Sequence, residues 1–417
     1  MTVKDGSAVR RAERLFILSS CCGVTGETVL TDSAVIMLYL ASLGAGNTGL
    51  LFSTSVLPLF NGLAVIPMAV LAPRFGVRKL VLASCAVSCM GYLAASLAPW
   101  FGFGAKTVLW GITCAALVQA GFIAGWFPLL NSFVSPETRV AFLGRMRFFH
   151  QLCAAVFVLL AGWFIHGGES AGRLFFTVLL ASLIFCGRFF CILAVPPFPE
   201  EGRKDFRSWR QDLAEAASLG KLRRFSFYQI LFNAGSFGIL PLALLCLKRI
   251  GLPDGVTVIV SGSSFVGMML GYWFIRHLAG KFSEKGVVML LCVLCLPSAV
   301  GFALLRSLPG TLVCILLALS LCGASFAVAA FSVVSSAVVM SCAEKENASM
   351  TMAFGNAFYY GSAGLVRILL SCAAGAAWFG SLEGSVFGSG FGLLFILFAV
   401  LMTLSLLVAP WFFRKER

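Results

Sequence analysis

Charged side chains are scarce in this chain. Only 12% of its 417 residues are charged, 17 are acidic and three are histidines. A soluble domain of this length needs many more charged residues to cover its surface. Hydrophobic residues make up 59% of the chain, and apolar runs of about 18 or more residues, long enough to span a membrane, recur from end to end. The composition therefore predicts an all-α membrane protein that crosses the bilayer many times.

Signatures of catalysis and cofactor binding are also missing. The sequence contains no phosphate-binding loop, nucleotide fingerprint or zinc motif, which argues against ATP-driven transport. Cys292 and Cys295 have the spacing of a redox or metal motif, but no histidine or acid lies near them. We therefore interpret the 15 cysteines as packing residues. Because His150 has no acidic neighbour in the sequence, we expect no enzyme activity, no metal and no cofactor.

Apolar runs divide the chain into twelve predicted transmembrane helices. They cover roughly residues 15–43, 48–71, 79–99, 106–131, 147–167, 173–195, 224–248, 255–277, 286–305, 310–340, 350–379 and 389–412. The first run is too long for the core of a cleavable signal peptide, so we expect it to be retained as a helix.

Basic residues indicate how these helices are oriented. Of the 31 lysines and arginines, 24 fall on the side of both termini and five fall on the other side. The 24 include the basic residues of the segment 132–147. The positive-inside rule then predicts cytoplasmic termini, and we expect a location in the plasma (inner) membrane. The net charge of +14 thus reflects topology and attraction to anionic membrane lipids, and we expect no binding to nucleic acid.

A short basic loop occurs twice in the sequence. Residues 71–80 read LAPRFGVRKL, and residues 278–287, 207 positions later, read LAGKFSEKGV. A second pair of loops repeats an acid and an alanine at the same offset, with Glu137 and Ala141 matching Glu344 and Ala348. The constant offset predicts that a six-helix unit has been duplicated.

The two predicted units are joined by a long polar segment. The first unit covers residues 1–195 and the second covers 224–417. Residues 196–223 lie between them and begin with prolines that end the sixth helix. Phe206 and Trp209 then fall at helical spacing among basic residues. This pattern predicts a short amphipathic helix on the cytoplasmic membrane surface.

This organisation resembles the major facilitator superfamily of secondary transporters. Residues 74–79, RFGVRK, are similar to the loop signature of that family, which usually runs Asp-Arg-x-Gly-Arg-Arg/Lys. The resemblance implies two pseudo-symmetric six-helix bundles that rock around a substrate site at the membrane midplane. The motifs of drug/proton antiporters are absent, since residues 148–155 contain no proline and Ala116 stands where those proteins carry an arginine.

The loop signature departs from the family at the position that matters for gating. Pro73 replaces the usual aspartate, and Gly280 replaces it in the second half. In the family this acid helps to latch the two halves together on the cytoplasmic side. We therefore predict a cytoplasmic gate made from other charged residues of the two loops, namely Arg74, Arg78, Lys281 and Glu284.

Two acidic residues fall inside the first predicted helix. A charge near the bilayer centre costs about 2.5–3.5 kcal/mol on insertion scales, so such residues need a reason. Glu27 lies near mid-depth and Asp32 lies further out, and an ideal helix separates them by about 140°. The resemblance implies that this helix lines the cavity and that one of these acids carries the coupled proton, since burial disfavours a charged carboxylate. The alternative is a structural ion pair with an arginine.

Two arginines also fall inside predicted helices. Arg367, on the eleventh helix, is expected either to hold an anionic group of the substrate through its guanidinium or to be the fixed counter-ion of Glu27 or Asp32. Arg188, on the sixth helix, is expected to extend its side chain to the cytoplasmic interface.

Neutral polar residues occur on helices that face the cavity in the family. Amides suit substrates with hydroxyl or carboxylate groups, and they also join helices through hydrogen bonds worth about 0.6 kcal/mol each. An aromatic residue such as Trp126 is expected either to stack on the substrate or to anchor at the interface. The predicted substrate-binding residues are Asn61, Gln119, Trp126, Gln229, Asn233, Asn356, Tyr359 and Arg367.

These observations predict a secondary active transporter of a small polar metabolite that works by alternating access. We predict protons as the coupling ion, and symport is favoured because the antiporter motifs are absent. Two alternatives stay open: efflux of amphipathic compounds, and a membrane receptor or sensor that does not transport. We expect a monomer whose partners are its small-molecule substrate, protons and membrane lipids.

Overall fold

Every element in the described part of the chain is a helix. The computed structural model describes residues 6–134, 136–166, 170–198, 208–249, 252–304, 310–342, 347–376 and 390–413. A helix satisfies all its backbone hydrogen bonds within one segment, which is what a long apolar run needs in a bilayer.

The helices of the first half are long and joined by short turns. Their bounds are α1 Gly6–Thr31, α2 Ala34–Ser42, α3 Asn47–Phe75, α4 Val77–Leu97, the short 3-10 turn η1 Ala98–Phe101, α5 Ala105–Asn131, α6 Pro136–His166 and α7 Ser170–Leu193. The turn between α3 and α4 is a single residue, Gly76, whose φ of 84° favours glycine.

The second half follows the same plan after a short linking helix. The linking helix is α8 Trp209–Ser218, and the helices after it are α9 Gly220–Ser236, α10 Ile239–Arg249, α11 Asp254–Lys281, α12 Glu284–Leu304, α13 Gly310–Cys342, α14 Ala348–Gly375 and α16 Gly390–Phe412. Among the described residues, 11 spans are long and apolar enough to cross a membrane, and the bent pair α1 and α2 makes a twelfth. The predicted twelve-helix fold is confirmed.

Two of the spans are broken near their middle. Between α1 and α2 the axis bends by 44°, and the Ser33 hydroxyl satisfies the break by donating to the Val29 carbonyl at 2.8 Å and accepting from the Val35 amide at 3.2 Å. The predicted helix 224–248 is divided into α9 and α10 at Phe237 and Gly238. The second break leaves the Phe237 carbonyl available to a side chain from another helix.

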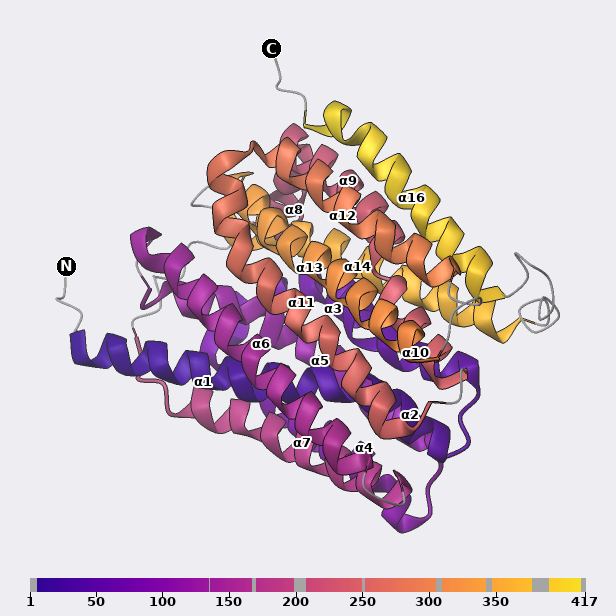
Figure 1. The fold of residues 1–417 in the computed structure, drawn as a ribbon. Coiled ribbons are helices and arrows are strands. Elements are labelled where there is room, and N and C mark those ends of the chain that lie inside the picture. Colours follow the sequence, from indigo (N-terminus) through magenta and orange to yellow (C-terminus); the bar gives the residue numbers. More distant parts are fainter. Residues whose placement is uncertain are drawn as a thin grey trace.

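The two halves meet along two pairs of helices. α3 packs against α14, and α6 packs against α11. In Figure 1 the start of α1 and the end of α16 lie toward one end of the bundle, and α2 and α10 lie at the opposite end. We call these ends the termini side and the far side.

The linking helix α8 is docked on the second half. Ala216 is fully buried, Leu213 packs against the hydrophobic core, and the Asn347 amide donates to the Asp212 carbonyl at 2.8 Å and to the Glu215 carboxylate at 3.3 Å. The amphipathic pattern therefore serves packing against the start of α14, a contact that the sequence did not predict. The predicted apolar position Phe206 lies outside the described residues.

Candidate functional site

Glu27 is paired within the first half. Its carboxylate lies 3.1 Å from Nη1 of Arg188 on α7, and it accepts a short hydrogen bond from the Gln119 amide on α5. The Tyr92 hydroxyl on α4 donates to the Gln119 carbonyl oxygen at 3.3 Å. The Glu27–Arg188 pair, Gln119 and Tyr92 together join four helices that all precede the linker.

Arg188 does not extend to the interface, so that prediction was wrong. The residue is only 2% exposed, and the rings of Phe122 and Phe185 lie 4.4 and 5.1 Å from its guanidinium carbon. Gly23 on α1 makes the space, because a Cβ atom there would lie 1.5 Å from the Arg188 Nε. The ion pair therefore requires a residue without a side chain at position 23 of α1.

Asp32 is paired across the two halves. Its carboxylate lies 2.9 Å from Nη1 of Arg367 on α14, and Nη2 donates to the second carboxylate oxygen at 3.2 Å. Of the two roles predicted for Arg367, the structure has the counter-ion of Asp32. Glu27 and Asp32 therefore have partners in different parts of the molecule, in line with their predicted separation of about 140° on a helix.

The remaining partners of Arg367 are two backbone carbonyls that prolines leave without a helical hydrogen bond. Its Nη1 donates to the Thr54 carbonyl at 2.7 Å, and its Nε donates to the Phe237 carbonyl at 3.1 Å. In a regular helix each carbonyl would accept from the residue four positions later, which is Pro58 after Thr54 and Pro241 after Phe237. Proline has no N–H, so both carbonyls are free for the arginine.

Small residues close the boundary between the halves from the middle of α3 and α14 toward the far side. A Cβ on Gly62 would lie 2.2 Å from the Gly361 backbone nitrogen, and one on Gly364 would lie 2.3 Å from the Leu59 nitrogen. Nearer the far end, the Ser371 hydroxyl donates to the Thr48 carbonyl at 2.7 Å. α3 and α14 are thus in backbone contact around the Asp32–Arg367 pair.

A second contact closes the same side between α6 and α11. A Cβ on Gly162 would lie 2.7 Å from the Ile259 side chain, and one on Gly255 would lie 2.5 Å from the His166 Cβ. Both pairs of helices that join the halves are therefore tightly packed on the far side.

The predicted amides of the second half bond to its own helices. The Asn233 amide donates to the Tyr359 carbonyl at 2.8 Å and to the Ser362 hydroxyl at 2.9 Å, while the Gln229 amide donates to Ser335. The side-chain oxygens of Gln229 and Asn233 are buried without a hydrogen-bond partner, and so is that of Asn61 on α3. These three acceptor atoms remain candidates for contact with a substrate.

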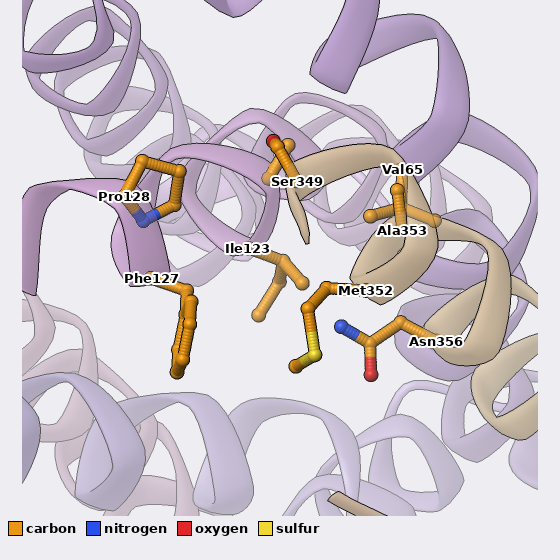
Figure 2. Close-up of a pocket in the computed structure, with 9 residues that line it drawn as sticks. Val65, Ile123, Phe127, Pro128, Ser349, Met352, Ala353 and Asn356 are labelled. Atoms are coloured by element: carbon orange, nitrogen blue, oxygen red, sulfur yellow. The ribbon is translucent and has the colours of Figure 1, made fainter. Parts of the chain in front are cut away.

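Asn356 lines a pocket between the halves on the termini side. The pocket holds about 20 Å³, enough for about one water molecule. Figure 2 shows Asn356 and Met352 of α14 pointing toward Ile123 and Phe127 of α5. Trp126 does not line this pocket and packs instead beside Phe16, at 6.3 Å between ring centroids.

Tyr359 is buried in the second half. Its ring lies 5.6 Å from that of Phe237 and 5.2 Å from that of Tyr360, measured between centroids. Its backbone carbonyl accepts the hydrogen bond from Asn233, so its neighbours hold both the ring and the backbone in place.

The four predicted gate residues do not form one cluster. Arg78 donates to the Leu193 and Val195 carbonyls at the end of α7, at 3.1 and 2.7 Å, so it caps a helix within its own half. Arg74, Lys281 and Glu284 are exposed, and no ion pair joins Glu284 to another residue that the structure describes. Glu284 instead begins α12, where an acid suits the helix dipole.

Arg147 lies at the boundary between the halves and was not among the predicted site residues. Arg147 was counted among the basic loop residues, but it lies within the membrane-spanning part of α6, Phe142–His166. Its Nη2 donates to the Ser336 hydroxyl on α13 at 3.3 Å, and its guanidinium carbon lies 5.7 Å from the Tyr272 ring centroid on α11. The charged start of the predicted fifth helix, 147–167, was the signal that pointed to it.

Comparison with known proteins identifies the class of the molecule. The family model of the major facilitator superfamily matches residues 16–366, so the chain belongs to this superfamily of membrane transporters. No curated protein sequence matches it. Within the described residues, no group of three histidine, cysteine or acidic side chains is placed to hold a metal ion.

Solved structures of transporters share the fold at low sequence identity. A variant of the nucleoside transporter NupG aligns with a TM-score of 0.72 and 13% identity, over 97% of this chain and 100% of that one. A POT family transporter in complex with a thioalcohol-conjugated peptide gives 0.69 and 11%, over 98% and 97%. A bacterial homologue of the human lysosomal transporter Spinster, inward-facing and occupied, gives 0.64 and 12%, over 98% and 97%.

Proposed function

We propose that this protein is a proton-coupled symporter for a small polar metabolite. The observation that carries the proposal is the Asp32–Arg367 ion pair, which joins two halves that must separate when the far side opens. Protonation of Asp32 removes the charge that holds Arg367, so proton binding and opening of the far side are linked. Substrate binding between the halves then completes the cycle.

Glu27 has a supporting role in this proposal. It is 19% exposed, and its partner Arg188 belongs to the same half, so rocking of the two halves does not have to break their pair. Protonation of Glu27 alters contacts within the first half, through Gln119. It affects the substrate site only through rearrangement of side chains in that half. We therefore place the main coupling step at Asp32.

The proposed orientation places both termini in the cytoplasm of the plasma (inner) membrane, with the protein acting as a monomer. In this orientation the far side faces outward, where the packing of α3 against α14 and of α6 against α11 closes the path. The pocket beside Asn356 then lies on the cytoplasmic half of the boundary.

The test uses the purified full-length chain. A thermal-shift screen of sugars, organic acids, amino acids, nucleosides, short peptides and amphipathic drugs finds compounds that raise the unfolding midpoint. Nucleosides and peptides are included because of the structural neighbours. Each hit is added to proteoliposomes, and we expect the outer medium to become more alkaline as substrate and protons enter together.

Two variants decide the coupling assignment. Asp32→Asn should abolish proton-coupled accumulation while substrate exchange continues, and Glu27→Gln should reduce accumulation less. If both variants keep full proton-coupled accumulation, the coupling assignment is wrong. If hits are amphipathic compounds that move only outward, the protein is an efflux transporter instead.

A further inference from the structure

We infer that the substrate carries an anionic group, a carboxylate or a phosphate, that binds to Arg147. This inference rests on the proposed transport function and deepens it. The site consists of Arg147 and His150 on α6, Tyr272 on α11 and Ser336 on α13, which we call the Arg147 cluster. It lies between the halves on the termini side.

The cluster draws its residues from both halves. Arg147 on the first half donates to Ser336 on the second half at 3.3 Å, and its guanidinium faces the Tyr272 ring. The His150 ring also lies edge-on to Tyr272, with 6.3 Å between centroids. A group bound here touches both halves at once, which is where an alternating-access transporter holds its substrate.

Arg147 lacks the partner that the other buried arginines have. Arg188 pairs with Glu27 and Arg367 pairs with Asp32, whereas none of the described carboxylates pairs with Arg147. An arginine inside a membrane span is costly and needs a compensating group. The guanidinium fork suits a carboxylate or phosphate, which it binds through two parallel hydrogen bonds.

The neighbouring side chains can complete an anion site. Ser20 on α1 holds Nδ1 of His150 at 2.8 Å, which leaves Nε2 as the ring nitrogen for another partner. The Tyr272 hydroxyl and two guanidinium nitrogens of Arg147 add further donors. Arg147 and Tyr272 are half-buried, so a ligand can reach them while losing part of its hydration.

The test compares pairs of ligands in which one member carries an additional anionic group. The purified full-length protein, in nanodiscs of phosphatidylcholine, is titrated with glutamate and glutamine, ribose 5-phosphate and ribose, and uridine monophosphate and uridine, and thermal shift gives each affinity. We expect the anionic member of at least one pair to bind tenfold or more tightly than its neutral partner. Arg147→Gln should bring that ratio close to one, and Arg147→Lys should keep part of it.

Arg145→Gln is the matched control. Arg145 lies two residues away on the same helix, is 53% exposed and pairs with Glu13 at 3.4 Å. Its replacement should leave the ratio of affinities unchanged. A general effect on opening of the halves changes both members of a pair by the same factor, so only the ratio reports on the anion site.

Three outcomes would overturn the inference. The first is that the neutral member of every pair binds as tightly as the anionic one, and the second is that the ratio of affinities survives in Arg147→Gln. The third is that only added phosphatidylglycerol stabilises the protein through Arg147, which would assign the cluster to a lipid headgroup. If a neutral compound binds and is transported, the proposed function stands without the anion site. If no compound of any class binds, both are rejected.

Discussion

Two acids five residues apart on the first span belong to different parts of the molecule. Glu27 lies in the core of the first half, where Arg188 and Gln119 hold it. Asp32 lies at the boundary, where Arg367 holds it from the other half. Both acids have an arginine partner, but only the second pair joins parts that would move relative to each other under the proposed alternating access.

In the proposed mechanism, this difference separates a structural role for Glu27 from a gating role for Asp32. A buried pair within one rigid bundle mainly maintains that bundle, and removal of one partner leaves an uncompensated charge. A pair between two bundles changes the balance between closed and open states, because it exists only in one of them. Substitutions at Glu27 should therefore appear first in stability, and substitutions at Asp32 first in conformation.

The largest expected effect is on stability, at Glu27. Glu27→Gln removes the charge that compensates Arg188, which is 2% exposed, and should lower the free energy of unfolding by about 3–5 kcal/mol. Unfolding of the purified protein in a mild detergent measures the loss. Glu13→Gln is the control, because the Glu13–Arg145 pair is exposed and should contribute about 1 kcal/mol or less.

A double variant sharpens this prediction. Glu27→Gln combined with Arg188→Gln removes both charges and should recover most of the lost stability. An equally small effect of Glu27→Gln and Glu13→Gln would mean that Arg188 finds another partner, and the structural role of Glu27 would be lost.

The spans could be predicted from the sequence, whereas the pairings could not. Apolar length alone requires a helix in the membrane, so the twelve spans followed from composition and the repeat. Arg188 was placed at the interface because its depth was read from its own helix, and only the packing of α1 against α7 brings Glu27 to it. Arg367 was left with two roles, since the sequence does not say which acid its helix meets.

Two prolines mark the carbonyls that hold Arg367, although the sequence alone does not show that they lie near it. Pro58 and Pro241 each leave a carbonyl without a helical partner four residues earlier, at Thr54 and Phe237. Arg367 donates a hydrogen bond to both carbonyls. A buried arginine together with proline-freed carbonyls predicts such a site only when the helices are known to be neighbours. That knowledge comes from the fold.

The next expected effect concerns the close contact of α3 with α14. Gly62→Val places side-chain atoms against the Gly361 backbone, 2.2 Å from a Cβ on Gly62, and backbone cannot move away as a side chain can. We expect a cost of about 1–3 kcal/mol to the closed state. Gly144→Val is the control, because nothing lies within 4 Å of a Cβ there.

Cross-linking measures this change in conformation. Thr48→Cys and Gly375→Cys place two thiols across the far side, where a Cβ on Gly375 would lie 3.4 Å from the Thr48 Cβ, close to the separation in a disulfide. The exposed Cys114, Cys153 and Cys372 are first replaced by serine. Gly62→Val should lower the yield of the cross-link, and an unchanged yield would show that the contact at Gly62 does not report on closure.

A smaller shift is expected from the boundary acid itself. Asp32→Asn removes the ion pair but leaves Arg367 its two carbonyl partners, so the closed state should lose about 1.4 kcal/mol, or tenfold in population. The same cross-link should form about tenfold more slowly. Glu27→Gln should leave the rate unchanged, and a similar slowing in both variants would remove the distinction between the two acids.

The smallest effect tests the proline-freed carbonyls. Pro58→Ala restores an amide that bonds to the Thr54 carbonyl within α3, so Arg367 loses one acceptor while the helix gains one bond. The two changes nearly cancel in stability, since a hydrogen bond contributes about 0.5–1.5 kcal/mol net. The interaction across the boundary is nevertheless weaker, and the cross-link should form about two- to threefold more slowly. Pro297→Ala in α12, which lies within the second half, should not change the rate. If Pro58→Ala behaves like Pro297→Ala, the Thr54 carbonyl does not strengthen the boundary, and Asp32 alone holds Arg367 to the first half.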